Sequence, residues 1–431
     1  MDHSTALLTD RYELTMVRGA LASGTAARRA VFEVFARHLP AGRRYGVVAG
    51  TGRLLDALER FRFDAPTLEY LTSQGIVDEP TASWLSSYRF SGDIWGYGEG
   101  DLYFPGSPLL VVEGGFAEGV ILETLALSIL NHDAAIASAA SRMVHAAAGR
   151  PIIEMGSRRT HEMAGVAAAR AAYLAGFTSS SNLEAGRLYG VPTAGTSAHA
   201  FTLLHDSERH AFAAQLDALG RDTTLLVDTY DVARAVEVAV SLAGPELGAV
   251  RLDSGDLAET AHEVRAQLDA LGATKTRIIV TSDLDEYAIA GLAAAPIDGY
   301  GVGTSLVTGS GAPTAALVYK LVARSETEDG PLRPVAKRSV GKPSRGGRKW
   351  GVRHLGEDGK AIAEVVSVSE PDPGPYDRSL LTRLVRDGEI IGREPLAEAR
   401  IRHERALAEL PSRAFQLSRG YPAVPTEFLN G

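Results

Sequence analysis

The pattern of apolar and polar positions changes along the 431 residues. From residue 151 to about 323, short apolar runs alternate with segments of helical spacing, which predicts seven strand–helix units and a parallel sheet. The predicted strands are Ile152–Met155, Gly176–Thr178, Val191–Ala194, Thr224–Asp228, Ala249–Asp253, Arg277–Thr281 and Gly299–Gly303. Seven or eight units favour a closed barrel, with an open doubly wound sheet as the alternative.

The first 115 residues predict a mixed α/β unit. Residues 14–21 have helical spacing, residues 30–35 alternate as a strand, and residues 93–113 predict antiparallel strands because glycine, proline and aromatics interrupt apolar pairs. Residues 116–148 have the spacing of one long buried helix, with a predicted break near Asn131.

After residue 323 the chain becomes charged and hairpin-like. Residues 379–392 predict a hairpin around Asp387 and Gly388, and residues 394–410 predict an amphipathic helix. We expect these pieces to rejoin the N-terminal strands. The predicted organisation is therefore an N-terminal α/β domain at 1–115, a catalytic α/β barrel at 116–323, and a C-terminal segment at 324–431 that returns to the first domain.

Composition narrows the function classes. Hydrophobic content of 45% and charged content of 23% are typical of a globular protein, and the net charge of −9 argues against general nucleic-acid binding. The absence of cysteine excludes disulfides, thiol catalysis and thiolate metal sites. No run approaches the ~18 apolar residues of a membrane span, and the N-terminus does not resemble a signal peptide. These features predict a cytoplasmic enzyme without a membrane or nucleic-acid partner.

Polar residues gather where predicted strands end, which is where ligands bind in parallel α/β folds. Arg251 precedes a turn in which Asp253 and Asp256 flank Ser254 and Gly255. Two such carboxylates suit ribose hydroxyls or a magnesium ion. The alternative is a capped helix start, but the neighbouring motifs favour the functional interpretation.

Two further motifs indicate phosphate and proton chemistry. Gly301, Gly303 and Thr304 predict a turn whose backbone N–H groups hold a phosphate, although no Walker sequence follows. His199 stands among small residues at the end of a predicted strand, so its ring is accessible to act as a nucleophile or proton carrier. No histidine spacing indicates a zinc site.

Two adjacent arginines, Arg158 and Arg159, follow the first predicted strand of the central region. An arginine there can make a two-point contact with a carboxylate or phosphate. The alternative is a surface pair that Glu154 and Glu162 satisfy. The acidic run at residues 283–286 is as consistent with a charged helix start as with a site.

Six stretches, in this order, resemble the nicotinate phosphoribosyltransferase family. They are residues 7–16 (LLTDRYELTM), 104–109 (FPGSPL), 154–159 (EMGSRR), 195–199 (GTSAH), 250–257 (VRLDSGDL) and 301–304 (GVGT). The basic segment at residues 337–349 is also similar to the family. The resemblance extends over nearly the whole chain.

The resemblance implies an irregular α/β barrel of the type II phosphoribosyltransferase kind joined to a smaller discontinuous α/β domain, as a homodimer. It implies that nicotinate and 5-phosphoribosyl-1-diphosphate give nicotinate mononucleotide and diphosphate in NAD salvage. ATP hydrolysis is coupled to this reaction, which is formally that of a ligase, with ATP as co-substrate and Mg²⁺ as cofactor.

The resemblance also implies the site residues. His199 would be the phosphorylated residue and, with Asp253 and Asp256, catalytic. Tyr12 would stack on the pyridine ring, and one of the two adjacent arginines would face its carboxylate. Arg251 and the turn after it, with Asp253, Ser254 and Asp256, would hold the phosphoribosyl diphosphate, and the glycine-rich turn would hold the 5′-phosphate. The substrate-binding set is Tyr12, Arg158, Arg159, Ser180, Thr196, Arg251, Ser254, Gly255, Gly301, Gly303 and Thr304.

Two other functions are alternatives. A related transferase could use nicotinamide, which needs no cation for a carboxylate, or quinolinate, which needs more cations and no ATP. A non-catalytic phosphosugar-binding protein is the other alternative, against which the intact His199, Asp253 and Asp256 argue.

Overall fold

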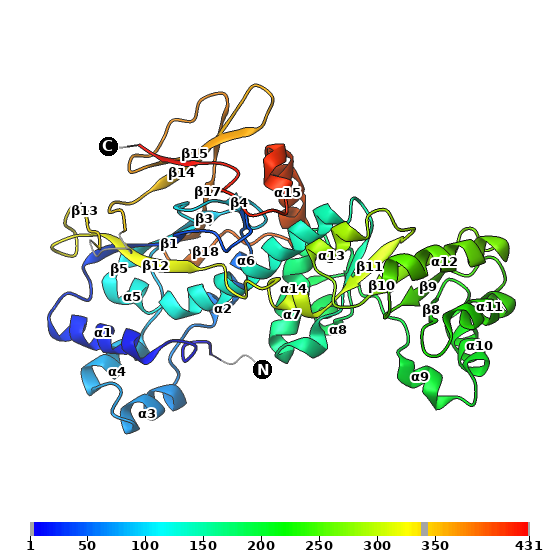
Figure 1. Ribbon diagram of the computed structural model, residues 1–431. Coiled ribbons are helices and arrows are strands. Elements are labelled where there is room, and N and C mark those ends of the chain that lie inside the picture. Colours follow the sequence, from blue (N-terminus) through cyan, green and yellow to red (C-terminus); the bar gives the residue numbers. More distant parts are fainter. Residues whose placement is uncertain (1–3, 338–343, 430–431) are drawn as a thin grey trace. The chain divides into compact units, whose positions relative to one another are not determined.

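The computed structural model describes residues 4–337 and 344–429 (Figure 1). The chain forms two compact units. The terminal unit contains residues 1–138 and 314–431, and the central unit contains residues 139–313. The segment predicted to form the barrel, 116–323, therefore includes both points of division.

The terminal unit contains a seven-stranded antiparallel sheet in the order β13-β12-β1-β5-β3-β17-β18. Its strands are β1 Arg29–Ala36, β3 Asp93–Tyr97, β5 Leu110–Gly115, β12 Leu317–Arg324, β13 Arg333–Pro334, β17 Leu381–Arg386 and β18 Glu389–Ile390. Because β12 pairs with β1 and β17 with β3, both ends of the chain contribute to one sheet. The predicted hairpin is confirmed, since Asp387 and Gly388 between β17 and β18 have positive φ of 47° and 80°, as a type I′ turn requires.

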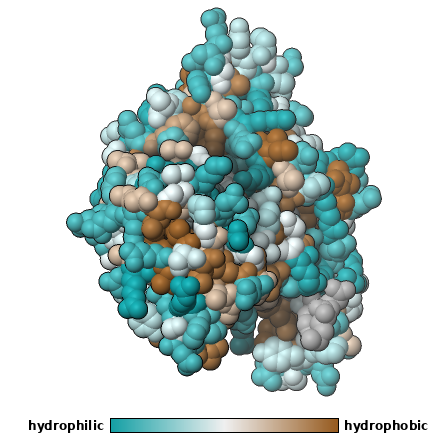
Figure 2. Space-filling view, turned by 90° about the vertical axis from the view of Figure 1, so that its right-hand side faces the viewer, coloured by the Kyte–Doolittle hydropathy of each residue, from teal (hydrophilic) through white to brown (hydrophobic). Residues whose placement is uncertain are grey.

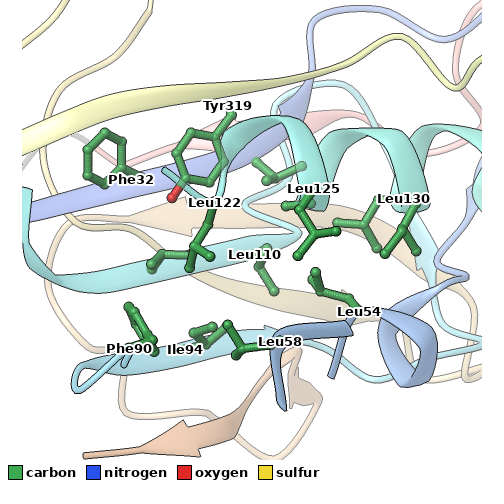
Figure 3. Close-up of a cluster of buried hydrophobic side chains, with 14 of the residues drawn as sticks. Phe32, Leu54, Leu58, Phe90, Ile94, Leu110, Leu122, Leu125, Leu130 and Tyr319 are labelled. Carbon is green, nitrogen blue, oxygen red and sulfur yellow. The ribbon is translucent and has the colours of Figure 1, made fainter. Parts of the chain in front are cut away.

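One buried apolar cluster joins this sheet to helices α1 to α6 (Figure 3). Phe32 of β1 stacks on Tyr319 of β12 with ring centroids 5.1 Å apart, and Leu58 of α2 and Leu125 of α6 belong to the same cluster. The helices are α1 Arg11–Ala22, α2 Thr51–Glu59, α3 Ala65–Ser73, α4 Glu79–Ser86, α5 Phe116–Val120, α6 Glu123–Ala146, which continues into the central unit, and α15 Leu396–Ala408.

The long helix predicted at residues 116–148 is interrupted, but not where expected. The predicted break near Asn131 is wrong, because α6 runs through this position and the interruption falls at Ile121 and Leu122. The side chain of Asn131 instead accepts a hydrogen bond from the Leu317 N–H at 2.8 Å and donates to the Leu317 carbonyl at 3.2 Å, which holds the start of β12. Among the described residues, Phe116–Ala146 is long and apolar enough to span a membrane, but 67% of its apolar window is buried in the protein, as in a core helix.

Two smaller sheets complete the terminal unit. One pairs β2 with β4, and the other has the order β16-β14-β15-β19. The buried Arg353 of β14 links them, since its guanidinium donates to the Leu102 carbonyl at 2.7 Å and to Glu364 of β15 at 2.8 Å. The strands are β2 Gly46–Val47, β4 Leu102–Tyr103, β14 Trp350–Leu355, β15 Ala361–Ser367, β16 Asp377–Ser379 and β19 Thr426–Phe428.

The central unit is built on a six-stranded parallel sheet in the order β7-β6-β11-β10-β9-β8. Its strands are β6 Ile152–Glu154, β7 Ser179–Ser180, β8 Thr224–Leu226, β9 Ala249–Leu252, β10 Arg277–Thr281 and β11 Gly299–Val302. The first strand pairs with the last, which is the order of a barrel and not of the doubly wound alternative.

The barrel is open on one side. The predicted strand at residues 191–194 is reduced to a single bridge between Ser180 and Thr193, and within residues 139–313 no ladder joins this segment to β8. The prediction of a closed barrel is therefore wrong, whereas the half-barrel agrees with an irregular α/β barrel. The helices are α7 Glu162–Leu174, α8 Leu183–Tyr189, α9 His199–Leu204, α10 Glu208–Leu219, α11 Val232–Ala243, α12 Leu257–Ala270, α13 Glu286–Gly291 and α14 Thr304–Val307.

Candidate active site

A cavity of about 220 Å³ lies at the carboxyl ends of four neighbouring strands of the central unit, β6, β9, β10 and β11. This is the edge at which parallel α/β sheets bind ligands. Most of its lining is polar or glycine, which suits a phosphorylated ligand more than an apolar one. The lining residues are Met155, Arg158, Arg159, Arg251, Asp253, Thr281, Ser282, Asp283, Gly301, Gly303 and Thr304.

His199 stands beside this cavity as the first residue of α9. Its Nδ1 is 3.2 Å from the Thr229 hydroxyl. Its Nε2 is 3.9 Å from a carboxylate oxygen of Asp228 and 3.9 Å from one of Asp253, and 41% of the side chain is exposed. The ring is thus open to solvent and flanked by two carboxylates.

Asp228 is a site residue that the sequence patterns did not single out. It follows β8, its side chain is only 4% exposed, and its Oδ2 accepts hydrogen bonds from the Asp253 N–H and the Ser254 hydroxyl, both at 2.8 Å. Its Oδ1 is buried and has no hydrogen-bond partner among the described residues. Asp253 was identified because it is a carboxylate at the end of a predicted parallel strand, and Asp228 has the same position at the end of its own strand.

The two carboxylates predicted after Arg251 have different roles. Asp253 lines the cavity and accepts a hydrogen bond from the Thr281 hydroxyl. Asp256 instead caps α12, accepting a hydrogen bond from the Glu259 N–H at 3.1 Å, and does not line the cavity. Gly255 separates them with φ of +85°, a conformation that favours glycine. For Asp256 the helix-cap interpretation fits the contacts better.

Arg251 is the most enclosed cation of the cavity. Its guanidinium donates to the Thr196 hydroxyl at 2.5 Å, and its Nε is buried without a hydrogen-bond partner in the described part of the chain. Burial lowers the pKa of Arg251, while Asp253 and Asp228 act in the opposite direction. Because Arg251 is partly buried and lines the cavity, its guanidinium is suited to bind an anion there.

Arg158 and Arg159 are exposed in a short 3₁₀ turn and form no ion pair with any described residue. The alternative partner, Glu154, is buried; it accepts hydrogen bonds from the Ser180 hydroxyl at 2.5 Å and from the Gly156 N–H. Burial raises the pKa of Glu154. Ser180 is therefore turned toward Glu154 and is absent from the cavity lining, whereas both arginines belong to it.

The glycine-rich turn has the tight packing that its sequence requires. A Cβ on Gly301 would lie 2.5 Å from the Thr281 methyl and 2.8 Å from the Met155 sulfur, so β11 can approach its neighbours only as glycine. Gly303 precedes the four-residue helix α14, and Thr304 is exposed as its first residue. Both residues line the cavity.

Two predicted features lie in the terminal unit. Tyr12 is 46% exposed on α1, and burial together with Glu123 and Glu13 raises its pKa to about 12. In the basic segment, residues 338–343 lie outside the described residues. Arg348 and Lys349 are committed to ion pairs, with Glu113 at 2.9 Å and with Glu33 at 2.8 Å.

Comparisons with known proteins identify the family. Residues 7–131 match the nicotinate phosphoribosyltransferase (NAPRTase) N-terminal domain. Over 430 residues the chain is 58% identical to nicotinate phosphoribosyltransferase pncB1 of Mycobacterium tuberculosis, covering 97% of this chain and 94% of the relative. The chain belongs to the nicotinate phosphoribosyltransferase family. The human member is 33% identical over 436 residues, covering 86% of this chain and 80% of the relative.

Solved structures agree with this family assignment. The crystal structure of human nicotinic acid phosphoribosyltransferase aligns with a TM-score of 0.84 and 28% identity over 98% of this chain and 97% of that chain. Nicotinate-nucleotide pyrophosphorylase from Pyrococcus furiosus aligns with a TM-score of 0.76 and 24% identity over 95% of this chain and 96% of that chain, which shows the shared fold alone. The fold class is therefore mixed α/β with a parallel half-barrel.

Proposed function

We propose that this chain transfers the phosphoribosyl group of 5-phosphoribosyl-1-diphosphate to nicotinate, giving nicotinate mononucleotide and diphosphate for NAD salvage, with ATP hydrolysis coupled to the transfer. The observation that carries the proposal is the cavity at the strand ends. It combines three arginines, a glycine-rich turn and Asp253, and His199 lies 3.9 Å from that carboxylate.

The charges match the reaction. Breaking the C1′–diphosphate bond develops positive charge on the sugar and negative charge on the leaving group. Asp253 supplies a carboxylate for the ribose, and the arginines supply cations for the anionic groups. The turn at Gly301, Gly303 and Thr304 would hold the 5′-phosphate through backbone N–H groups and a hydroxyl.

His199 would couple ATP to the transfer. A ring nitrogen attacks the γ-phosphorus of ATP, ADP leaves, and the phosphohistidine is later hydrolysed. Asp228 and Asp253, both 3.9 Å from Nε2, stabilise the positive imidazolium that precedes loss of the ring proton. Thr229 orients the ring through Nδ1.

The nicotinate carboxylate would meet Arg251, and not Arg158 or Arg159 as the resemblance implies. A guanidinium that is enclosed and has an unused donor rejects a neutral amide, because binding nicotinamide leaves its charge unpaired. Arg158 and Arg159 are exposed, so this penalty is small for them, and they would face the diphosphate. Tyr12 would stack on the pyridine ring.

Magnesium would enter with the diphosphate. Among the described residues no group of three or more acidic or histidine side chains is arranged to hold a metal by itself. Mg²⁺ is commonly bound by one or two carboxylates together with substrate phosphates, and Asp253 and Asp283 line the cavity in a way that fits this use. The bound ion would neutralise the leaving diphosphate.

We further propose a cytoplasmic homodimer. Large apolar side chains are exposed on the central unit, including Leu183, Leu203 and Leu204 at 77%, 62% and 78%. Figure 2 shows hydrophobic residues gathered in patches on a mainly hydrophilic face. Such surface suits contact with a second copy.

The central experiment compares nicotinate, nicotinamide and quinolinate, each with and without ATP, by product formation. Nicotinate should be strongly preferred, and ATP should accelerate its use. Incubation with γ-labelled ATP should give an acid-labile, base-stable label that His199→Asn abolishes, while slow ATP-independent transfer remains. Undiminished label in that variant, or equal use of nicotinamide, contradicts the proposal.

The roles of the three arginines can be distinguished by replacing Arg251, Arg158 and Arg159 with Met, one at a time. Arg251→Met should raise the KM for nicotinate and reduce the preference for nicotinate over nicotinamide. Arg158→Met and Arg159→Met should weaken apparent affinity for the sugar donor and leave the pyridine ratio unchanged. The reverse pattern would assign the carboxylate to one of the two adjacent arginines.

A further inference from the structure

A buried carboxylate outside the cavity joins two of its walls. Glu286 is the first residue of α13 and is 2% exposed. One of its oxygens accepts a hydrogen bond from the Arg142 Nε at 3.0 Å, and the other accepts one from the Ser310 hydroxyl at 2.5 Å. Arg142 is itself buried on α6. Burying a charged pair costs desolvation free energy, which the attraction between the two groups and their hydrogen bonds must offset.

The second partner of this carboxylate has an unfavourable backbone conformation. Ser310 has φ of +50°, between Gly309 at +64° and Gly311 at +79°. Glycine adopts this region freely, whereas another residue costs on the order of 1 kcal/mol. Serine differs from glycine here by the one group that contacts Glu286, its hydroxyl. The strained backbone conformation of Ser310 is therefore retained together with its hydrogen bond to Glu286.

The contact spans the two walls of the cavity. On one side, Ser282 and Asp283 line the cavity and lead into the helix that Glu286 begins. On the other, Gly303 and Thr304 line the cavity and lead through α14 to Ser310. The Ser310 N–H also donates to the Ser305 carbonyl at 2.6 Å, which ties the strained turn to α14.

We propose that Glu286 is a positioning residue that, through Ser310 and Arg142, fixes the separation of the acidic wall at Asp283 from the phosphate turn at Gly303 and Thr304. It thereby sets the affinity for the phosphorylated ribose, while the pyridine binds elsewhere in the cavity. This inference rests on the proposed function, because it takes 5-phosphoribosyl-1-diphosphate as the ligand.

The test is Ser310→Gly, which removes the hydroxyl and relieves the strain together. The thermal midpoint should fall only modestly, because relief of the strained φ, on the order of 1 kcal/mol, offsets part of the about 1.5–3 kcal/mol lost with a hydrogen bond to a buried charged group. The KM for the sugar donor should rise about tenfold, as expected for loss of a hydrogen bond to a charged group that positions a binding wall. The nicotinate KM should stay within about twofold.

The matched control is Thr308→Ala. It deletes a hydroxyl from the same turn, but that hydroxyl donates within the turn to the Thr304 and Ser305 carbonyls and does not reach Glu286. Its KM for the sugar donor should stay close to wild type. Glu286→Gln provides a second test: it removes the charge that faces Arg142, so it should also raise the KM for the sugar donor, and the double variant with Ser310→Gly should depart from additivity because both changes act through Glu286.

Calorimetric binding of the sugar donor separates this inference from the proposed function. If wild type binds the sugar donor but does not use nicotinate, the function is wrong, and weaker binding by Ser310→Gly still supports the positioning role. If Ser310→Gly binds like wild type, or if both KM values rise equally, Glu286 is not a positioning residue. If wild type does not bind the sugar donor, both proposals fall.

Discussion

Charged groups are paired differently in the terminal unit and at the cavity of the central unit. In the terminal unit, Arg353 is fully buried and lies 2.8 Å from Glu364, which is also fully buried. Lys349 lies 2.8 Å from Glu33 with both side chains nearly inaccessible. Each of these cations has a carboxylate at contact distance.

At the cavity of the central unit the charges are left incomplete. The Nε2 of His199 is 3.9 Å from its nearest carboxylates, and the Asp228 Oδ1 and the Arg251 Nε are buried without a partner among the described residues. Both the terminal unit and the cavity contain cations and carboxylates, so what differs is the role of these charges. Unpartnered buried atoms occur in both places, since Arg353 Nε and Nη1 also lack a hydrogen-bond partner among the described residues. The distances differ, however: the terminal pairs are in contact at 2.8 Å and hold strands together, whereas His199 stands 3.9 Å from the carboxylates beside the cavity.

The largest effect should come from removing the cation of a buried ion pair in the terminal unit. Arg353→Met leaves the Glu364 carboxylate buried and unpaired, which should lower the free energy of unfolding by about 3–5 kcal/mol. Urea unfolding followed by circular dichroism measures it. The control is Arg393→Met, since the Arg393–Glu59 pair is 45% and 58% exposed and such pairs contribute about 0–1 kcal/mol. Equal losses of unfolding free energy in the two variants would show that buried and exposed ion pairs do not differ in their contribution to stability.

A cavity carboxylate should affect turnover more than stability. Asp253→Asn should lower kcat about 100- to 1000-fold, or roughly 2.7–4 kcal/mol, because its charge acts on the developing oxocarbenium ion. Asp256→Asn should leave kcat and the thermal midpoint nearly unchanged, because asparagine is also a good N-cap. Steady-state kinetics gives kcat and thermal unfolding gives the midpoint for both variants. A similar loss of kcat in the two would place Asp256 in the site after all.

Glu13 is a terminal-unit carboxylate without a cation, and it should make stability depend on pH. It is fully buried, one oxygen accepts hydrogen bonds from the Thr124 N–H at 2.8 Å and hydroxyl at 2.6 Å, and the other has no partner among the described residues. Burial raises the pKa of Glu13 from 4.5 to about 7. The folded state therefore holds this proton more tightly than the unfolded state, and its stabilisation is lost as pH rises from 4.5 to about 7.

Glu13→Gln should abolish this dependence. The variant should match wild type near pH 4.5 and exceed its free energy of unfolding by on the order of 2 kcal/mol at pH 8. Thermal midpoints across this range measure the difference, with Glu69→Gln, an exposed glutamate, as the control. A variant less stable than wild type at pH 8 would show that Glu13 is ionised and favourable in the fold.

The smallest effect concerns the hydroxyl that holds Arg251. Thr196→Val removes the 2.5 Å hydrogen bond to its guanidinium. Loss of a hydrogen bond to a charged group corresponds to about 1.5 kcal/mol at the low end, which suits a partly exposed arginine, so the nicotinate KM should rise about tenfold while kcat is retained. Unchanged nicotinate KM would mean that Arg251 is held in place by packing alone.

Much of the architecture follows from sequence patterns. Predicted and observed strands coincide at Arg277–Thr281, and β6, β8, β9 and β11 differ from their predictions by one or two residues at one end. Short apolar runs between helical segments predict such strands locally. The run at residues 191–194 is similar in length, but whether it pairs depends on a neighbour about thirty residues away, so it was overpredicted.

The chain by itself determined the residue types of the site and, through its motifs, the family. The tertiary structure decided which of them converge. It brought Arg251, Asp253, Gly303 and both adjacent arginines to one cavity and left Ser180 and Asp256 out of its lining. It also revealed Asp228 and Glu286, whose roles depend on partners that are distant in sequence. Periodicity and caps are local properties, whereas the pairing of a buried charge is set only when remote strands come together.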